Sequence, residues 1–337
     1  MVFAFNLFLF NHLTVIFRAV HLQRQHWLPD NITVSTEFVL LSIINNPSRQ
    51  YLLFIVFCII YIITVIVNLT VITLIWQDSH LHKPMYFFLA NLAFIEILYT
   101  TAITPNSLKS FLREDRTISF ISCFTQVYFF VALAGSECIL LSVMAYDRYI
   151  AICHPLLYSI KMNSSFCIHL VVLSWVIGFL NSLLQTMYLA SLPYCNDHKV
   201  SSFFCDIPPL LKLSCAHNKY LEIFVNLIGE CILVGDLFLT IISYMAIIKT
   251  VIRTPRKNRS YKTFSTCGSH LTVVTVFFGT ILIPFLHPSS PSSGQDKVLA
   301  VIYGVVTPLI NPFIYTIRNA DFQKAIEKWI INRNQYH

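Results

Sequence analysis

Seven long apolar stretches constrain the fold of this chain more than any other feature of its sequence. A helix needs about 20 apolar residues to cross the hydrocarbon core of a bilayer, and each stretch reaches that length with few charges. With 56% hydrophobic and only 12% charged residues, a water-soluble domain of this size would lack the polar surface that it needs. We therefore predict an all-α membrane protein, a bundle of seven transmembrane helices over residues 51–76, 84–108, 120–153, 166–189, 221–252, 261–286 and 297–317.

Basic residues are distributed unevenly between the two sides of the predicted bundle. The segment 249–262, between the fifth and sixth stretches, holds six Lys or Arg residues in 14 positions. Short cytoplasmic loops carry an excess of Lys and Arg, so this side is predicted to be cytoplasmic and the N-terminus extracellular. The formal net charge of +7 is then explained by membrane-flanking residues, and we expect no nucleic-acid partner. We predict an extracellular segment over 1–50, a seven-transmembrane domain over 51–317 and a cytoplasmic tail over 318–337, in the plasma membrane.

The glycosylation sequons offer a separate check on this orientation. Asn31-Ile32-Thr33 lies in the predicted extracellular segment, whereas the other sequons fall within a helix or on the cytoplasmic side, at Asn68, Asn163 and Asn258. Only Asn31 is expected to carry a glycan. Residues 1–29 form an atypical extension, in which polar residues interrupt an apolar run. Two interpretations remain for it: a signal-like segment, or an extended gene start without function.

Four of the ten cysteines are predicted to lie on the extracellular side, in an oxidising compartment. They are Cys123, Cys195, Cys205 and Cys215. The other six fall within or at the ends of the stretches, where a small buried hydrophobic role is expected. Four cysteines allow three disulfide pairings, and their spacing does not choose among these. Metal binding with the nearby His198 and His217 is a weaker alternative, because the ligand spacing is not compact.

A charged motif stands at the end of the third stretch, where Asp147-Arg148-Tyr149 lies within MAYDRYIAICHPLLY (144–158). An arginine at this depth is costly unless it is paired, and the adjacent aspartate can hold it until another partner offers better contacts. Further strings follow the same order along the chain: PMYFFLANLAF (84–94), SY (243–244), KTFSTCGSHL (262–271) and NPFIYTIRN (311–319). Together, over residues 30–332, they resemble the odorant receptor branch of the rhodopsin-like receptors.

This resemblance implies a function and a set of roles. A small hydrophobic odorant would bind between the third, fifth and sixth spans, and a stimulatory, olfactory-type heterotrimeric G protein would raise cyclic AMP. No cofactor and no enzymatic activity are implied. The resemblance pairs Cys123 with Cys205 and Cys195 with Cys215. It assigns coupling or switch roles to Asp147, Arg148, Tyr149, Tyr244, His270, Asn311, Pro312 and Tyr315.

Polar residues inside the spans suggest an inner network. Glu96 and Glu137 are intramembrane acids, each costing about 2.5 to 3.5 kcal/mol unless it is stabilised. With Asn68 and Asn311, the resemblance implies a water-linked or sodium-like site at Glu96 and Glu137; two protonated, hydrogen-bonded structural acids are the alternative. The family's usual glycine before Asn68 is Val67 here, and glutamate replaces the commoner aspartate at position 96.

Helical spacing places Phe130, Ala134, Glu137, Leu141, Met144 and Arg148 on one stripe of the third span. The predicted ligand cavity is lined by apolar residues of the third and sixth spans: Phe130, Val131, Ala134, Gly135, Phe278, Ile281, Leu282 and Phe285. Plain helix packing is the alternative at each position. Glu230 lies on the same stripe as Tyr244, so it either lines the cavity, favouring a basic or hydrogen-bond-donating ligand, or is structural. Asp236 receives no role.

Proline gives the end of the seventh span a physical interpretation of its own. Pro312 frees a backbone carbonyl that an asparagine can satisfy, which makes this half of the span deformable; an ordinary proline kink is the alternative. Residues 318–331 are patterned as a short amphipathic helix on the inner lipid surface.

Three other classes of protein are alternatives to an odorant receptor. A transporter or channel would need paired repeats or a polar path through the membrane, and a membrane enzyme would need a catalytic set at usable spacing. A non-olfactory receptor of the same superfamily is the closest alternative.

Overall fold

The computed structural model describes residues 14–20, 37–41, 43, 46–112, 116–194, 198–215, 219–253, 257–286, 294–317 and 319–334. Each of the seven predicted spans is helical in these residues, so the predicted seven-helix bundle is confirmed. The spans correspond to α2 (Pro47–Gln77), α3 (Pro84–Leu112), α4 (Phe120–Cys153), α6 (Ser164–Ser191), α8 (Lys219–Arg253), α9 (Lys257–Leu286) and, as the seventh, α10, η3 and α11. Within the described residues, six are long and apolar enough to cross a membrane, and α9 adds a shorter apolar run at Cys267–Ile281.

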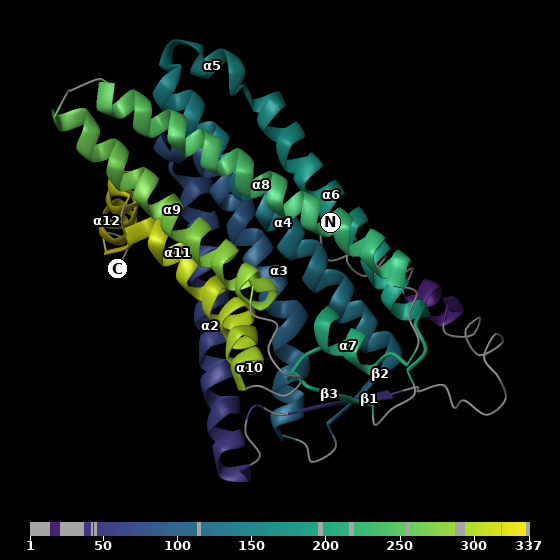
Figure 1. Ribbon diagram of the computed structural model, residues 1–337. Helices are drawn as coiled ribbons and strands as arrows, with labels where there is room; N and C mark the ends of the chain where they lie inside the picture. Colours follow the sequence, from purple (N-terminus) through teal and green to yellow (C-terminus); the bar gives the residue numbers. More distant parts are fainter. Residues whose placement is uncertain are drawn as a thin grey trace.

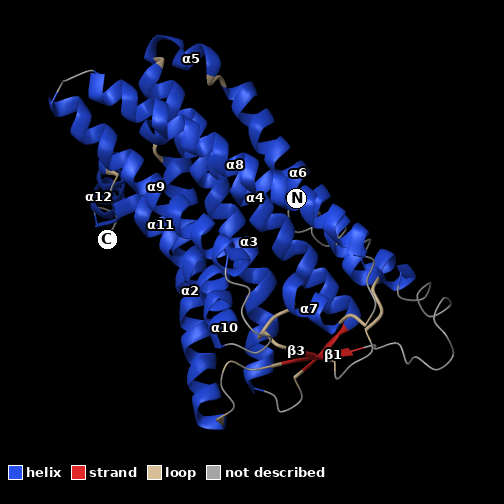
Figure 2. Ribbon diagram, viewed as in Figure 1, coloured by secondary structure: helices blue, strands red, loops and turns tan. Residues whose placement is uncertain are grey.

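The helices run side by side, with α4 in the middle of the bundle (Figures 1 and 2). α4 contacts α3, α6, α8 and α9, which is why it is also the most deeply buried of the spans. A stripe on α4 can therefore contact several spans at once.

Short polar side chains start three of the spans. Asn46 accepts a hydrogen bond from the backbone of Ser48 at the start of α2, and Ser119 and Asn163 cap α4 and α6 in the same way. Such N-caps satisfy backbone N–H groups that the first helical turn leaves free. The Asn163 sequon is thus a helix cap, since its side chain accepts from Phe166 N at 2.9 Å.

Small residues let α4 and α6 approach closely. Ser174, Gly178 and Ser182 recur every four residues on the buried face of α6. A Cβ at Gly178 would lie 2.4 Å from the Ser136 hydroxyl and 2.7 Å from the Ala132 carbonyl, so a larger residue would force the backbones apart. Membrane helices, which gain little from apolar burial against each other, use such small-residue faces to pack.

The seventh span is not a uniform helix. α10 (Gly294–Val301) leads into a π-helical turn, η3 (Ile302–Val306), and then into α11 (Thr307–Ile317), which contains Pro312. Both irregularities change which groups of this span are available for contacts with other helices. A π turn alters the direction of the side chains near it, and Pro312 removes a helical hydrogen bond.

Short elements cover one end of the bundle, visible as red strands in Figure 2. The strands β1 (Glu37–Leu40), β2 (Thr117–Ser119) and β3 (Lys199–Val200) form a sheet in the order β2-β1-β3, with β1 antiparallel to β2 and parallel to β3. The short helix α7 (Ile207–Leu213) lies at the same end. This end carries Cys123, and we call it the disulfide end.

The other end, where α4 finishes beyond Arg148, is called the arginine end. It holds the short helices η1 (Ser79–Leu81), η2 (Pro155–Leu157) and α5 (Tyr158–Lys161). The C-terminal helix α12 (Ala320–Asn334) follows α11 here and matches the predicted short helix.

Part of the N-terminal extension is helical and packs on the disulfide end. Residues 14–20 form a helix in which Phe17 is fully buried, with its ring 6.2 Å from that of Phe124. All other residues of the extension, and Asn31, lie outside the described residues. The helical segment therefore belongs to the same apolar cluster as Phe38 and Tyr194.

Candidate functional site

A disulfide ties the start of α4 to the loop between α6 and α8. Cys123 and Cys205 are bonded, with their Cα atoms 5.5 Å apart. Cys215 is also disulfide-bonded; its expected partner, Cys195, lies outside the described residues. The loop is thereby held against the core of the bundle at Cys205.

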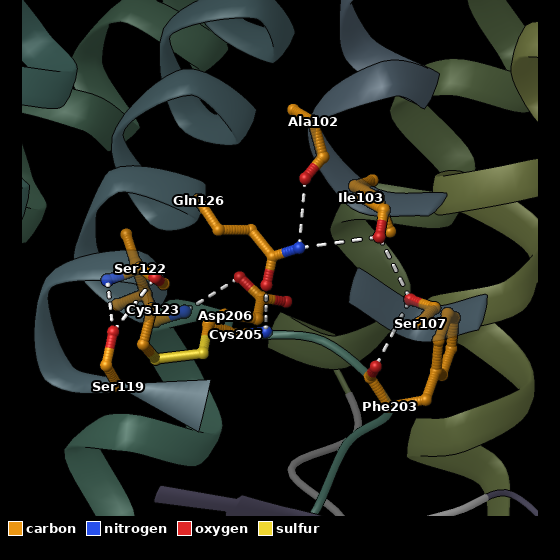
Figure 3. The surroundings of a disulfide bond; sticks show 11 residues. Ala102, Ile103, Ser107, Ser119, Ser122, Cys123, Gln126, Phe203, Cys205 and Asp206 are labelled. Carbon is orange, nitrogen blue, oxygen red and sulfur yellow. Dashed lines mark hydrogen bonds between the residues drawn. A yellow bond between two sulfur atoms is a disulfide. The ribbon is translucent and has the colours of Figure 1, made fainter. Parts of the chain in front are cut away.

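Gln126, one turn beyond Cys123, fixes the same loop through hydrogen bonds (Figure 3). Its Nε2 donates to the Ala102 carbonyl at 2.9 Å and to the Ile103 carbonyl at 3.4 Å, while its Oε1 accepts from Cys205 N at 2.9 Å. Both ends of the amide are therefore used, and α3, α4 and the loop are joined at one residue.

Asp206 connects the loop to the seventh span. Its Oδ2 accepts from the Tyr303 hydroxyl at 2.6 Å, and its Oδ1 accepts from Ile207 N at 2.7 Å. Burial raises the pKa of Asp206 above its usual 3.8, while the bonds from Tyr303 and Ile207 act in the opposite direction. We call Gln126, Cys205, Asp206 and Tyr303 the rim cluster.

Aromatic rings lie directly beneath this loop. The Phe130 ring of α4 is 5.2 Å from the rings of Tyr99 and Phe204 and 6.0 Å from that of Tyr303. Phe130, a predicted ligand contact, thus lies below the loop and between α3 and the seventh span.

The other predicted cavity residues do not all face the same space. Val131, Ala134 and Ile281 are half-buried, and Phe278 is buried; the side chains of Leu282 and Phe285 lie outside the described part of the structure. Gly135 faces α6, because a Cβ there would lie 3.4 Å from the Cα of Gly178. The expectation that Gly135 lines a cavity toward α8 and α9 is therefore not met.

Glu230 also differs from the expectation. Its side chain is exposed on α8, whereas Tyr244, with which it was expected to share a face, is buried. The neighbouring Gly229 contacts α6 through Gln185. The expectation that Glu230 shares an inward face of α8 with Tyr244 is therefore not met.

Four polar residues meet in the middle of the bundle, and we call Asn68, Glu96, Glu137 and Asn311 the inner network. Asn311 Nδ2 donates to Oε1 of Glu96 and, at 3.2 Å, to Oε1 of Glu137. Glu96 and Glu137 therefore share the Asn311 amide as a donor. The structure thus brings together α2, α3, α4 and α11 through the residues that the sequence grouped.

Proline 312 explains how Asn68 joins this network. A proline removes the hydrogen bond to the carbonyl four residues earlier, which here belongs to Pro308. Asn68 Nδ2 lies 3.5 Å from that carbonyl and 3.0 Å from the carbonyl of Thr64. An asparagine of α2, rather than Asn311, therefore reaches the carbonyl that Pro312 leaves free.

Three oxygen atoms of the inner network are buried without a hydrogen-bond partner among the described residues: Asn68 Oδ1, Glu96 Oε2 and Asn311 Oδ1. A cavity of about 10 Å³ lies beside them, lined also by Pro312 and Tyr315. This is close to the smallest space that holds one water molecule. Oxygen acceptors of this kind fit a water molecule or a hard cation such as Na⁺; among the described residues, no group of three or more His, Cys, Asp or Glu gathers as a metal site.

His270 links three helices nearer the arginine end. Its Nε2 lies 3.1 Å from the Leu141 carbonyl, and its Nδ1 lies 2.8 Å from the Tyr244 hydroxyl. Because a carbonyl only accepts, Nε2 must donate, and a neutral ring then accepts from Tyr244 at Nδ1. Tyr315 packs on the other side, with its ring 6.4 Å from His270 and its hydroxyl without a hydrogen-bond partner among the described residues.

Arg148 is held by its neighbour in sequence. Its Nη2 donates to Asp147 at 2.9 Å, and Asp147 also accepts from the Tyr158 hydroxyl at 2.8 Å. Burial and the Asp147 carboxylate raise the pKa of Tyr158, so that this hydroxyl remains a donor. Tyr149 points elsewhere, toward His154 at 3.0 Å. The Asp147 side chain is fully buried, whereas that of Arg148 is 17% exposed.

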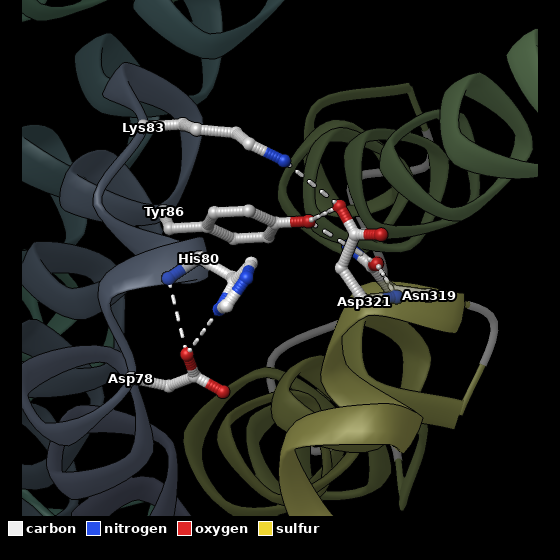
Figure 4. Close-up of polar contacts among 6 residues, drawn as sticks. All are labelled: Asp78, His80, Lys83, Tyr86, Asn319 and Asp321. Carbon is white, nitrogen blue, oxygen red and sulfur yellow. Dashed lines mark hydrogen bonds and ion pairs between the residues drawn. The ribbon is translucent and has the colours of Figure 1, made fainter.

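A polar junction fixes α12 to α3 beside this site (Figure 4). Asp321 pairs with Lys83 at 3.1 Å and accepts from the Tyr86 hydroxyl at 3.0 Å, while Tyr86 also reaches Asn319 at 3.2 Å. Nearby, hydrogen bonds from the backbone and side chain of His80 lower the pKa of Asp78. Exposed ion pairs contribute little energy, so the buried Tyr86 is the firmer part of this junction.

Sequence reasoning did not identify the rim cluster beyond Cys205. Gln126 follows Cys123 by about one turn and Asp206 follows Cys205 directly, so their proximity to the disulfide was a usable signal. Tyr303 carried no such signal, because its direction depends on the π turn in which it lies.

Known proteins resemble this chain over most of its length. Residues 57–333 match the family described as olfactory receptor. Human olfactory receptor 6B2 is 42% identical over 300 residues, covering 89% of this chain and 96% of that protein. Mouse olfactory receptor 5AP2 is 44% identical over 303 residues (90% and 96%), and rat olfactory receptor 1f45 is 43% identical over 299 residues (88% and 96%). The likeness therefore reaches from α2 into α12.

Proposed function

The chain belongs to the olfactory receptor family, and on that premise we propose that it activates a stimulatory G protein, raising cyclic AMP, when a small odorant binds between α4, α8 and α9. It is a multi-pass plasma membrane protein of a non-enzymatic receptor family. In our proposal the disulfide end is extracellular, Asn31 is glycosylated, and the arginine end with α12 faces the cytoplasm and its lipid surface.

The observation that carries this proposal is the continuous path along α4. Phe130 lies beneath the loop at the disulfide end, Glu137 belongs to the inner network, and the Leu141 carbonyl holds His270. Arg148 stands at the end of the same path, and its one ion-pair partner among the described residues is Asp147 beside it. A ligand that moves one part of this path can therefore affect the others.

The contacts of His270 suggest how the change is transmitted. If ligand binding favours a state in which α9 moves away from α4, the Leu141–His270 bond must break. Tyr244 would then be released from His270, and Arg148 could leave Asp147 for a segment of the G protein. Tyr315, whose hydroxyl has no hydrogen-bond partner among the described residues, could bond to a partner in that state.

The inner network is proposed to hold a water molecule or sodium ion in the resting state. Its unpaired oxygens and the adjoining cavity support this role, and collapse of the cavity would accompany activation. The residues that would contact the ion are Asn68, Glu96 and Asn311, and Glu137 would support them through its hydrogen bond from Asn311.

A cyclic AMP reporter screen with a chemically varied odorant panel tests the proposal. We expect a concentration-dependent response in cells that carry the receptor, and its loss in Arg148→Ala at equal surface expression. Lys161→Ala, which changes an exposed basic residue away from the Asp147 contact, is the matched control. A ligand-dependent response that survives Arg148→Ala would contradict the proposed coupling.

A further inference from the structure

A second buried acid lies in α8, outside the inner network. The Asp236 side chain faces α4 and is only 8% exposed. The Ser142 hydroxyl of α4 donates to the Asp236 backbone carbonyl at 3.1 Å, and the Asp236 carboxyl lies near Ser142 and Cys138 of α4. The carboxyl therefore lies at the interface of α4 and α8.

This acceptor site is not saturated. Asp236 Oδ2 is buried without a hydrogen-bond partner among the described residues. The Thr240 hydroxyl, one turn further along the same face and 1% exposed, is likewise unpaired. A buried polar atom without a partner is unfavourable, so a molecule that brings a hydrogen-bond donor to this place would be stabilised by it.

The position of Asp236 relates it to the proposed ligand cavity. Cys138, which contacts the acid, lies one helical turn from Ala134 on α4. Ala134 is half-buried on the stripe that carries Phe130. Asp236 therefore faces α4 within two helical turns of Ala134, on the side nearer the arginine end.

We propose that Asp236 is the polar anchor of the ligand site and selects small ligands that carry a hydrogen-bond donor, namely an alcohol, thiol or amine. The apolar part of the ligand would lie toward Ala134, and its donor would reach Asp236 Oδ2. The inference rests on the proposed function only for the location of the cavity. Glu230, the acid that the sequence singled out, is exposed and cannot take this role.

Matched ligand pairs test the inference on the purified full-length receptor. Each alcohol is compared with its methyl ether of the same length, and binding is followed as ligand-dependent thermal stabilisation. A hydrogen bond to a charged group contributes about 1.5 to 3 kcal/mol, equivalent to about tenfold or more in affinity. We expect the wild type to prefer the alcohol by this factor and Asp236→Leu to bind both members equally.

Two further variants separate the loss of the ligand contact from an effect on folding. Asp236→Asn keeps the size of the side chain and should lower the preference for the alcohol part of the way. Phe238→Leu, which alters an exposed residue of the same helix, should keep the full preference. In all variants the affinity for the ether should be unchanged.

The inference is overturned if the wild type binds alcohol and ether equally, if no alcohol, thiol or amine of the panel stabilises it, or if Asp236→Leu keeps the preference. A resident water molecule at Asp236 Oδ2 would give the last of these results. Cyclic AMP is measured separately: preference that depends on Asp236 but without a cyclic AMP response would contradict the proposed coupling and leave the anchor intact.

Discussion

Gln126 and Asn311 are both buried amides of the helix bundle, but they are used differently. Gln126 has hydrogen-bond partners at both ends of its amide, on α3 and on the loop at Cys205. Asn311 donates to two glutamates, while its Oδ1 has no partner among the described residues. The same contrast holds for the clusters to which they belong. Asp206 and Tyr303 of the rim cluster are also paired, whereas Asn68 and Glu96 of the inner network each have one oxygen without a partner in the described part of the chain.

The difference separates a fixed part of the molecule from a part that can rearrange. A fully paired buried cluster is costly to disturb, because each broken bond leaves a desolvated polar atom. A cluster with fewer hydrogen bonds among its own residues loses fewer of them when its contacts are exchanged. Ligand binding is therefore expected to pivot the bundle about the rim cluster and to change contacts in the inner network and around His270.

The largest effect is expected where the rim is held covalently. Cys205→Ser removes the bond to Cys123 and should lower the free energy of unfolding by about 2 to 5 kcal/mol. Surface expression should fall with it. Cys231→Ser, at a free and exposed cysteine, is the control and should leave both unchanged. Normal expression and stability of Cys205→Ser would mean that Gln126 and Asp206 fix the loop without the disulfide.

A smaller, pH-dependent effect is expected at Tyr303. Tyr303→Phe removes a bond to the Asp206 carboxylate, and for this half-buried hydroxyl we expect a loss toward the lower end of about 1.5 to 3 kcal/mol at neutral pH. The Tyr303 bond opposes the upward shift that burial gives the pKa of Asp206. Its contribution is therefore present when Asp206 is ionised and is lost as the pH falls through the raised pKa of the folded state.

Thermal unfolding of the wild type and of Tyr303→Phe across the acidic range measures this dependence. The difference in stability between the two proteins should shrink as the pH falls. A difference that stays constant, or grows, with acidification would show that the hydroxyl does not act through the Asp206 carboxylate.

The sequence predicts some parts of this comparison better than others. Spans such as 120–153 follow from the bilayer alone, because an apolar run of that length has one stable conformation in lipid, and the structure has α4 at the same residues. The inner network was also grouped correctly, since intramembrane acids such as Glu96 and Glu137 need polar partners.

The face that each helix turns inward was less predictable. Glu230 and Tyr244 are 14 residues apart, which leaves a rotation of about 40° at 3.6 residues per turn; this was enough to leave Glu230 exposed. Gly135 lies in the contact with α6 because Gly178 allows the two helices to approach closely there. This contact depends on how two helices pack, so neither helix sequence predicts it alone. Asp236 received no role for the same reason, as its partners are on α4.

The smallest effect on stability is expected when a tyrosine hydroxyl is removed near the inner network instead of from the rim cluster. Tyr315→Phe, like Tyr303→Phe, removes one hydroxyl, but the Tyr315 hydroxyl is buried without a hydrogen-bond partner among the described residues. Removing it breaks no bond seen in this state, so the free energy of unfolding should stay within about 1 kcal/mol of the wild type, on the stabilising side. If the hydroxyl bonds to a partner only when α9 moves, Tyr315→Phe should nevertheless lower the maximal cyclic AMP response. Tyr303→Phe should do the reverse: it should lower the free energy of unfolding and leave the cyclic AMP response per receptor at the surface less affected. A Tyr315→Phe variant that is clearly destabilised, or that signals fully, would place Tyr315 with the fixed part of the molecule and not with the part that rearranges.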